Sequence, residues 1–404
     1  MNQKTKNKVL TPTLIIIMAL ATGLVVASNY YAQPLLETIA KAFGLSVSQA
    51  GFIVTAAQLG YAAGLMFIVP LGDMFERRGL IVLMTLLSAA GMLITATSST
   101  VMGIIIGTAL TGLFSVVAQL LVPFAATLAE PAKRGKVVGI VMSGLLLGIL
   151  LARTAAGLLA AVGGWRTIYW VATVLLILVA IILWFALPRY KQSSGLNYPQ
   201  LLVSIISLFS RNTTLRTRAF LGALSFANFS VLWTSMAFLL ASPPYNYSEA
   251  VIGLFGLVGA AGALAASGAG QLVDKGKASQ TTSIGLVLLF LSWIPIAFGE
   301  VSIWALLLGI IVLDLAVQGV HVTNQSVMYR MMPEARSRLT AGYMTSYFIG
   351  GAAGSLISAM AYQYAQWRGV CITGAVLSLM GIVIWWLTKG KIAQEAVQQE
   401  EVQA

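Results

Sequence analysis

Twelve long apolar runs constrain the fold of this chain more than any other feature. An apolar stretch of about 18 or more residues is long enough to cross a bilayer as an α-helix. Of the 404 residues, 58% are hydrophobic and 9% are charged, whereas a soluble domain carries about 25% charged residues. We therefore predict an all-α membrane protein with twelve transmembrane helices. The runs lie, to within a few residues, at 12–35, 47–71, 80–98, 101–128, 137–162, 166–187, 219–242, 249–270, 280–299, 301–329, 340–364 and 368–388.

The net charge of +12 is explained by topology. If the N-terminus is cytoplasmic and the chain crosses twelve times, 20 of the 24 Lys and Arg residues are cytoplasmic. Lys41, Arg166 and Arg368 are then external, and Arg153 lies within the membrane. The positive-inside rule predicts this asymmetry. We expect an integral protein of a plasma membrane, such as the inner membrane of a bacterium, with both termini in the cytoplasm. We expect no nucleic-acid partner.

The two halves of the sequence repeat each other. Four features recur at an offset of 200 to 202 residues, which indicates duplicated six-helix halves; the pairs are Ser48 and Ser248, Asp73 and Asp274, Arg134 and Arg336, and Trp165 and Trp367. We predict an N-terminal half at 1–187, a cytoplasmic linker at 188–218 and a C-terminal half with a short cytoplasmic tail at 219–404. Duplicated halves are typical of transporters, with the substrate site between them near the midplane.

The linker contains one apolar segment, "YPQLLVSIISLF". Such a segment can lie as a helix on the membrane surface. An ordinary linker with a short helix is the alternative.

Four motifs carry a resemblance to a known family. The segments "NYYAQPLL", "LGDMFERRG", "GILLART" and "GGWR" resemble the arabinose-efflux-permease-like and twelve-span drug:proton antiporter branch of the major facilitator superfamily. The resemblance extends over nearly the whole chain. It implies two pseudo-symmetric six-helix bundles, the major facilitator fold, that alternate in opening to either side of the membrane.

The resemblance also implies a cytoplasmic gate. The family's loop between spans two and three has a Gly-x-x-x-Asp-Arg-x-Gly-Arg-Arg pattern. Asp73, Arg77 and Arg78 match this pattern, whereas Val69, Met74 and Glu76 depart from it. A second copy carries Asp274 and Lys275. The expected latch has Asp73 binding a helix N-terminus, where a carboxylate is favourable; ordinary charged turns are the alternative.

Polar residues recur on the four spans that line the cavity in this superfamily, namely spans 1, 4, 7 and 10. In 301–329, Asp314, Gln318, His321 and Gln325 are spaced four, three and four residues apart, so they share one helix face. Hydrogen bonding between helices is the alternative explanation for such residues. The candidate cavity residues are Asn29, Tyr30, Gln33, Thr108, Ser115, Gln119, Asn228, Trp233, Asp314, Gln318 and His321. Their amides, hydroxyls and aromatic rings suit a neutral or mildly amphipathic solute.

Arg153 lies inside the apolar segment "GLLLGILLARTAAGLLAAVGG". Placing a cation within a membrane costs a free energy of at least about 3 kcal/mol unless the cation contacts a partner or water. We expect it to face the cavity or the interface of the halves and to bind Asp314, Glu37 or an anionic substrate group. Snorkelling of its side chain to the membrane surface is the alternative.

Asp314 is the leading candidate for a proton site, because burial in general favours the neutral form of a carboxyl group. His321 is a second titratable candidate, with a neutral, hydrogen-bonded role as the alternative. The glycines of spans 5, 8 and 11, among them Gly144 and Gly148, permit close helix approach. We expect them where one half moves on the other; static packing is the alternative.

The repeated halves and polar stripes predict a secondary active transporter, and the resemblance implies that it exports a sugar, metabolite or amphipathic drug in exchange for protons. Proton-coupled uptake of a sugar or small metabolite is the alternative. The sequence contains one His, one Cys and no phosphate-binding Gly-x-x-x-x-Gly-Lys motif, so we expect no enzyme, no cofactor and no metal site. A channel and a solute sensor are the alternative classes of membrane protein. The expected partners are a small-molecule substrate, protons and the lipid bilayer, and the expected unit is a monomer.

Overall fold

A computed structural model describes residues 10–130, 133–191, 197–265, 267–331 and 336–403. All regular elements within these ranges are helices. The N-terminal helices are α1 (Pro12–Ala27), η2 (Gln33–Leu35), α2 (Leu36–Phe43), α3 (Val47–Ala63), η3 (Gly64–Ile68), η4 (Val69–Asp73), α4 (Arg77–Thr97), α5 (Val101–Phe114), α6 (Val117–Leu128), α7 (Arg134–Gly163) and α8 (Thr167–Ala186). The remaining helices are α9 (Tyr198–Arg211), α10 (Thr213–Ala241), α11 (Glu249–Ala265), α12 (Ser267–Asp274), α13 (Ala278–Leu291), α14 (Trp293–Ala297), η6 (Phe298–Glu300), α15 (Ile303–Met331) and α16 (Arg336–Gln403).

The predicted twelve spans are present. Among the described residues, nine helical segments are long and apolar enough to cross a membrane. One of them, Arg338–Ile392, supplies two spans because the backbone of α16 leaves the helical conformation at Ala365 and Gln366. The shorter apolar helices α1 and α11 supply the other two. Spans 1, 5, 7, 8 and 10 are built on α1, α7, α10, α11 and α15, and span 4 on α5 and α6 together.

Local side-chain caps start several of these helices. Ser46 and Gln49 form a capping box at the start of α3, and Asn197 and Gln200 form another at the start of α9. Such boxes satisfy backbone N–H groups that have no partner within the helix. The linker segment singled out from the sequence is therefore a helix, α9, with its own start signal.

Spans 1 and 4 are interrupted rather than continuous, unlike their predicted ranges. Helix α1 ends at Ala27, and α5 ends at Phe114 before α6 begins at Val117. The amide Nδ2 of Asn29 donates to Oγ of Ser115 at 2.7 Å, which joins the two breaks. Non-helical backbone at membrane depth occurs where it is buried in protein or lines a cavity. The breaks therefore mark the interior of the N-terminal half.

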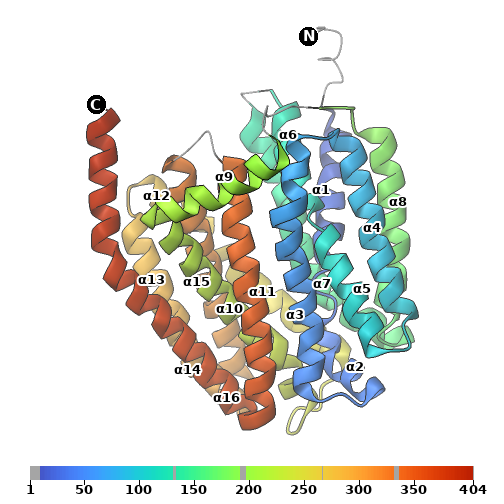
Figure 1. The fold of residues 1–404 in the computed structure, drawn as a ribbon. Helices are drawn as coiled ribbons and strands as arrows, with labels where there is room; N and C mark the ends of the chain where they lie inside the picture. The colour runs from blue at the N-terminus through green and yellow to red at the C-terminus, as the bar shows by residue number, and fades with distance from the viewer. Residues whose placement is uncertain (1–9, 131–132, 192–196, 266, 332–335, 404) are drawn as a thin grey trace.

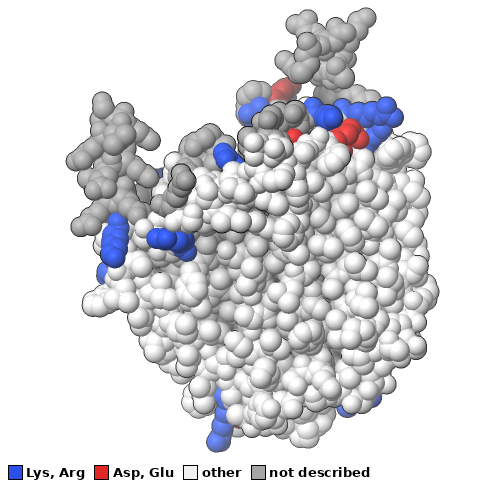
Figure 2. All heavy atoms as spheres, in the orientation of Figure 1, with Lys and Arg blue, Asp and Glu red and all other residues white. Residues whose placement is uncertain are grey.

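The bundle has two distinguishable ends. Helix α9 and the last part of α16 lie at one end, called the terminal end here, and α2 lies at the opposite, far end (Figure 1). Lys and Arg side chains gather at the terminal end, a few lie at the far end, and the band between them is uncharged on the face shown (Figure 2). Such a band is what a bilayer core requires of a protein surface.

The two halves contact each other near the far end. The hydroxyl of Thr38 in α2 donates to the carboxylate of Glu249 in α11. The backbone N–H of Ser48, in α3, donates to Oε1 of Gln363, in α16, at 3.1 Å. Deeper in the bundle, Nε2 of Gln58 donates to Oγ of Ser230 at 3.2 Å. These bonds close the far end in this conformation.

The glycines of span 5 divide between contacts within its own half and a contact with the other half. A Cβ at Gly144 or Gly148 would overlap a backbone carbonyl oxygen of α1, so both glycines pack span 5 on span 1 within the same half. Gly350 likewise faces the backbone of Ala223 in span 7 of its own half. Gly157 of α7 and Gly253 of α11 are among the glycines at which the two halves meet. Span 5 therefore does contact the other half, as expected, but through Gly157 and not through Gly144 or Gly148, because small residues permit close approach without specifying the partner helix.

The contact between α1 and α7 predicts a stability difference between two glycine substitutions. Gly148→Ala places a methyl group against the Gly23 carbonyl, and overpacking of this kind costs about 1–3 kcal/mol. Gly139 lies on an exposed face of the same helix, where a Cβ meets nothing within 4 Å. Gly139→Ala is therefore the matched control and is expected to leave stability unchanged or to raise it by up to about 1 kcal/mol, because Ala favours a helix more than Gly does. Thermal unfolding in detergent, followed by size-exclusion chromatography, measures both; equal stability of the two variants would contradict the contact.

Candidate functional site

Arg153 is the buried centre of the site. It lies in α7 with 3% of its surface exposed. Its Nε donates to Oε1 of Gln33 at 2.7 Å. Gln33 lies in η2, just after the break in span 1, and is 2% exposed. The guanidinium therefore stays inside the protein and does not snorkel to the surface.

Three aromatic rings surround the guanidinium. Its Cζ lies 3.9 Å from the ring centre of Trp233, 5.0 Å from that of Tyr30 and 5.3 Å from that of Phe229. A cation over an aromatic face within about 6 Å gains roughly 0.5–2 kcal/mol, more when water is excluded. Tyr30 belongs to the N-terminal half, whereas Phe229 and Trp233 belong to α10 of the C-terminal half. Arg153 thus binds both halves at once.

Asp314 is connected to this cluster through Trp233. The indole Nε1 of Trp233 donates to Oδ1 of Asp314 at 3.4 Å, and Asp314 is 4% exposed. The charges of Arg153 and Asp314 attract each other, but among the described residues the structure forms no Arg153–Asp314 ion pair within 4.0 Å. The aromatic ring of Trp233 therefore stands where a direct ion pair was expected.

Glu37 is placed differently from the prediction. It forms an ion pair with Lys41, one turn along α2. The expected pairing of Glu37 with Arg153 was wrong in this conformation. The reason is local: an acid and a base at i and i+4 face each other on a helix surface, and α2 lies at the far end, outside the buried cluster.

Several buried polar atoms in the N-terminal half lack a hydrogen-bond partner among the described residues. They include Oδ1 of Asn29, Nε2 of Gln33 and Nη2 of Arg153. A small void of about 10 Å³ lies beside two of them, lined by Gln33, Arg153 and Trp233 among others. Leaving a buried polar group unsatisfied costs about 1–3 kcal/mol. In this conformation the void has room for about one water molecule, which these atoms can bind.

The remaining residues of the span 10 stripe lie closer to the terminal end. His321 Nδ1 is 3.1 Å from the hydroxyl of Tyr343, and its ring lies 4.7 Å from that of Tyr347. Gln318 and His321 are half-buried, unlike Asp314. The stripe thus runs from a buried carboxylate towards a partly open, aromatic-lined region.

Three other predicted residues have structural partners. Asn228 accepts through Oδ1 from Trp293 Nε1 at 2.9 Å and from Ser378 Oγ at 2.8 Å, so it joins spans 7, 9 and 12 within its half. Thr108 donates to the carbonyl of its own helix. Gln119 hydrogen-bonds to Tyr61. The structure places Asn228 and Thr108 outside the Arg153 cluster, because a polar residue in a membrane helix can equally bind a neighbouring helix.

The predicted gate is rearranged around Arg77. Asp73 pairs with Arg77 at 3.6 Å, and Arg77 is buried beneath the rings of Phe124 and Tyr190. The helix N-terminus is bound by Glu76, whose carboxylate accepts from the N–H of Gly79 at 2.8 Å. Glu76 thus caps α4, while Asp73 lies near Arg77 and Arg338, the latter at the start of α16; its role as a latch stays a prediction.

Arg78 and Lys275 are the other predicted gate residues whose side chains the structure describes. The guanidinium of Arg78 lies over Trp184, at 4.7 Å. Lys275 is exposed beyond the end of α12. The side chain of Asp274 lies outside the described residues.

Sequence reasoning missed two buried residues, Phe229 of the Arg153 cluster and Arg218, whose partners lie outside that cluster. Phe229 lies four residues before Trp233, a spacing that places both on one helix face. Arg218 was assigned to the linker, but α10 begins at Thr213, capped by Asn212. Arg218 is 2% exposed and donates to Thr282 at 2.6 Å. The Asn before two threonines was a recognisable helix-start signal.

The fold and the cluster define a duplicated helical membrane protein with a polar site shared between its halves. The sequence profile of the Major Facilitator Superfamily matches residues 18–298 and 219–403. The chain belongs to this superfamily. It is therefore a transport protein of the secondary-transport class.

Two relatives illustrate the range of similarity. The uncharacterized transporter YgaY of Escherichia coli O157:H7 is 68% identical over 390 residues, which are 96% of this chain and 98% of that protein. A probable sugar efflux transporter of Pasteurella multocida is 24% identical over 399 residues, which are 96% of this chain and 95% of that protein.

A solved structure shares the fold. The bacterial homologue of the human lysosomal transporter Spinster, in an inward-facing and occupied conformation, superimposes with a TM-score of 0.76 at 15% identity. The match covers 93% of this chain and 96% of that one.

The Gln33 contact predicts a stability loss that a second glutamine should not share. Gln33→Leu removes the acceptor from a buried charged donor, at an expected cost of about 1–3 kcal/mol. Gln318 is half-buried, and the described residues offer it no hydrogen bond, so Gln318→Leu is the matched control. Thermal unfolding in detergent should show a clear loss for Gln33→Leu alone. Equal unfolding temperatures for both variants would remove Gln33 from the support of Arg153.

Proposed function

We propose that this protein is a secondary active transporter that exports a small organic solute in exchange for protons. It would act in a bacterial inner membrane with the terminal end, and so both termini, facing the cytoplasm. The basic residues at the terminal end support this orientation, because cytoplasmic loops are enriched in Lys and Arg. The proposed functional unit is the monomer.

The observation that carries the proposal is the Arg153 cluster. It combines a buried cation, aromatic rings from both halves and unpartnered amide and guanidinium atoms. A solute bound there touches spans 1, 5 and 7 together. Its affinity then depends on how the halves are oriented, which is what coupling between binding and alternating access requires.

The proposed substrate groups follow from the atoms on offer. Arg153 Nη2 and Gln33 Nε2 donate, and Asn29 Oδ1 accepts. These atoms suit carbonyl, hydroxyl or single carboxylate groups, while Tyr30 and Trp233 suit a ring or an apolar face. A sugar, a small metabolite or an amphipathic drug offers such groups. A multiply charged anion would bind less well, because Arg153 is the one cation among the described residues of the cluster.

Asp314 is the proposed proton carrier. Its only hydrogen-bond donor among the described residues is the indole of Trp233, which also stacks on Arg153. The ionised carboxylate of Asp314 can accept a hydrogen bond from a hydroxyl or amine of the solute, and protonation would remove its charge and so weaken that bond. Proton binding and solute binding would thereby compete, which is the requirement for antiport.

Efflux is favoured over uptake by similarity alone. The Pasteurella multocida relative bears the name of a probable sugar efflux transporter. Proton-coupled uptake of a sugar or small metabolite is the second candidate. In either direction, we propose that Asp73, Arg77, Arg78 and the Asp274–Lys275 turn close the terminal end when the far end opens.

The proton assignment predicts a specific loss of coupling. Everted membrane vesicles are acidified by respiration, and a pH-sensitive dye then reports alkalinisation when sugars, amphipathic drugs or organic acids are added. We expect solute-dependent alkalinisation in the wild type and none in Asp314→Asn. Glu130→Gln is the control, since the exposed Glu130 only pairs with Lys133. Alkalinisation that persists in Asp314→Asn would show that another group carries the proton.

The geometry around Arg153 predicts that charge alone is not enough. Arg153→Lys keeps the charge but loses the planar fork that stacks on Trp233 while bonding Gln33. We expect about tenfold weaker half-saturation of solute flux for Arg153→Lys and little flux for Arg153→Leu. Flux of radiolabelled solute in proteoliposomes measures both. Full activity of Arg153→Leu would exclude Arg153 from the site.

A further inference from the structure

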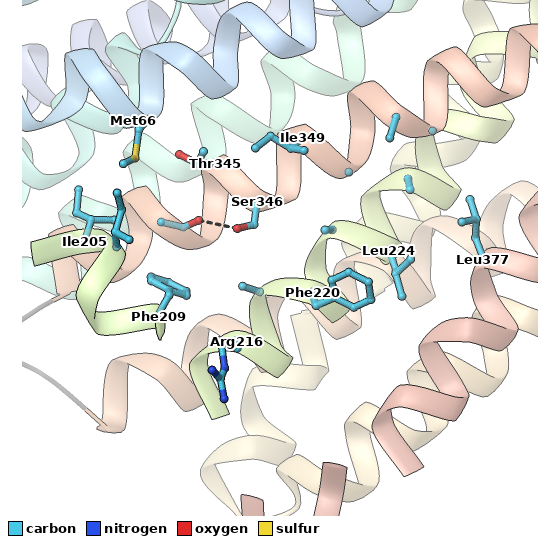
Figure 3. Close-up of a pocket in the computed structure, with 18 of the residues that line it drawn as sticks. Met66, Ile205, Phe209, Arg216, Phe220, Leu224, Thr345, Ser346, Ile349 and Leu377 are labelled. Carbon is cyan, nitrogen blue, oxygen red and sulfur yellow. Dashed lines mark hydrogen bonds between the residues drawn. The ribbon is translucent and has the colours of Figure 1, made fainter. Parts of the chain in front are cut away.

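A second, larger recess lies away from the Arg153 cluster. It has a volume of about 670 Å³ and lies between α9, α10 and the part of α16 before Ala365, with Met66 of η3 at one side (Figure 3). We call it the linker pocket. Its walls are almost entirely apolar; they include Ile205, Ile206, Phe209, Ala219, Phe220, Ala223, Leu224, Ile349, Ala353, Ile357 and Leu377.

The linker pocket opens on the outer surface of the bundle. Phe220, Ile206 and Ile349, which line it, are each 46% exposed or more. Phe220 and Leu224 project into it from α10, and Ile349 from α16 (Figure 3). In a membrane protein, such a surface faces lipid. The linker pocket is thus open to the bilayer, whereas Arg153 and Asp314 are buried between helices.

One end of the linker pocket is polar. Arg216 is the only charged residue among the described residues that line it. Its Nη1 donates to the carbonyl of Ser210 at 3.1 Å and its Nη2 to Oγ1 of Thr213 at 3.4 Å. A guanidinium has five N–H donors, so others remain available. Arg216 lies near the start of α10, close in sequence to the end of α9, which lies across the terminal end (Figure 1).

The dimensions suit a chain with a charged head. Along α10, Arg216 and Ala227 both line the pocket and are separated by about 16 Å at 1.5 Å per residue. Recesses of about 300–1,000 Å³ are large enough for small-molecule ligands. The recess is therefore elongated, positive at the terminal end and apolar along its length.

A bilayer offers one abundant molecule of this shape and charge. Lipid tails gain no hydrophobic free energy by leaving the bilayer for an apolar wall, so apolar lining alone selects no occupant. An arginine at the mouth adds attraction for a negative headgroup, worth about 1 kcal/mol near a membrane surface. We propose that the linker pocket binds one acyl chain of an anionic phospholipid, with the phosphate of that lipid at Arg216.

The linker pocket places such a lipid beside the linker. Helix α9 belongs to the linker between the halves and contacts both of them. Tyr198 donates to the carbonyl of Phe67 in the N-terminal half at 2.8 Å, and Phe209 packs on Gly342 in the C-terminal half. A lipid beneath α9 therefore lies where the linker meets both halves. This inference does not depend on which solute the Arg153 cluster binds.

Photo-crosslinking tests the proposal. The full chain is reconstituted in phosphatidylcholine vesicles that contain a small fraction of phosphatidylglycerol with a diazirine in one acyl chain. After illumination, mass spectrometry identifies the labelled peptides. We expect labelling to concentrate on the segments of α10 and α16 that contain Phe220 and Ile349. Uniform labelling of the lipid-facing surface would overturn the proposal.

Two pairs of variants separate the acyl chain from the headgroup. Ala353→Trp fills the recess from an exposed wall position and should abolish pocket labelling, whereas Ala90→Trp, on the exposed face of α4, should not. Arg216→Gln should reduce labelling by phosphatidylglycerol about fivefold but not labelling by an uncharged diazirine diacylglycerol. Lys389→Gln, also exposed, is the charge control.

Further outcomes would contradict the proposal. If Ala353→Trp leaves labelling unchanged, the acyl chain lies elsewhere. If Arg216→Gln leaves phosphatidylglycerol labelling unchanged, the headgroup is not bound by this arginine. If a transported solute competes for the linker pocket equally in the wild type and Arg216→Gln, the recess takes the solute rather than a phospholipid.

Discussion

The structure depends on the burial of one guanidinium. Moving a cation into the membrane interior costs about 3 kcal/mol on insertion scales. A hydrogen bond to a charged group returns about 1.5–3 kcal/mol, and stacking on an aromatic ring about 2 when water is excluded. Arg153 has both, through Gln33 and Trp233. The burial is therefore close to balanced, but only while helices from both halves stay in contact.

This requirement organises the helices around it. Gln33 reaches Arg153 because α1 ends at Ala27 and the chain turns before η2. Helix α11 comes close because Gly253 and Gly256 have no side chain to hold it away from the backbone of α7. On the other side, Trp233 joins the guanidinium to Asp314. The single positive and single negative groups at the centre are thus held one indole apart, and a proton or a solute that alters either one alters the contact between the halves.

The sequence predicted the architecture well because membrane spans are specified by length and apolarity. The twelve spans and the α9 helix follow from those properties and from capping residues such as Asn197. The sequence also indicated Gln33, Tyr30 and Trp233 as candidate cavity residues and Arg153 as facing the cavity or the interface, since such residues are costly or unusual at that depth. That Arg153 contacts the other three came from the structure.

The same reasoning did not identify the hydrogen-bond partners of the polar residues. Asn228 and Asn29 look alike in an apolar run, yet one binds Trp293 and Ser378 and the other binds Ser115. Which helix lies opposite is a tertiary fact. The breaks in spans 1 and 4 were missed for the same reason, because a polar residue that bridges two breaks resembles one that lines a continuous helix. Glu37 was misassigned because its neighbour Lys41 competes locally.

The central claim is that the Arg153 cluster holds the halves together and closes the far end. Spin labels at Lys41→Cys in α2 and Tyr364→Cys in α16, both exposed positions, report the opening of that end in a Cys371→Ala background. The distance distribution between the labels is measured by pulsed electron paramagnetic resonance, with and without Arg153→Leu. A shift to longer distances in Arg153→Leu is the predicted result. Identical distributions in the two proteins would contradict the account.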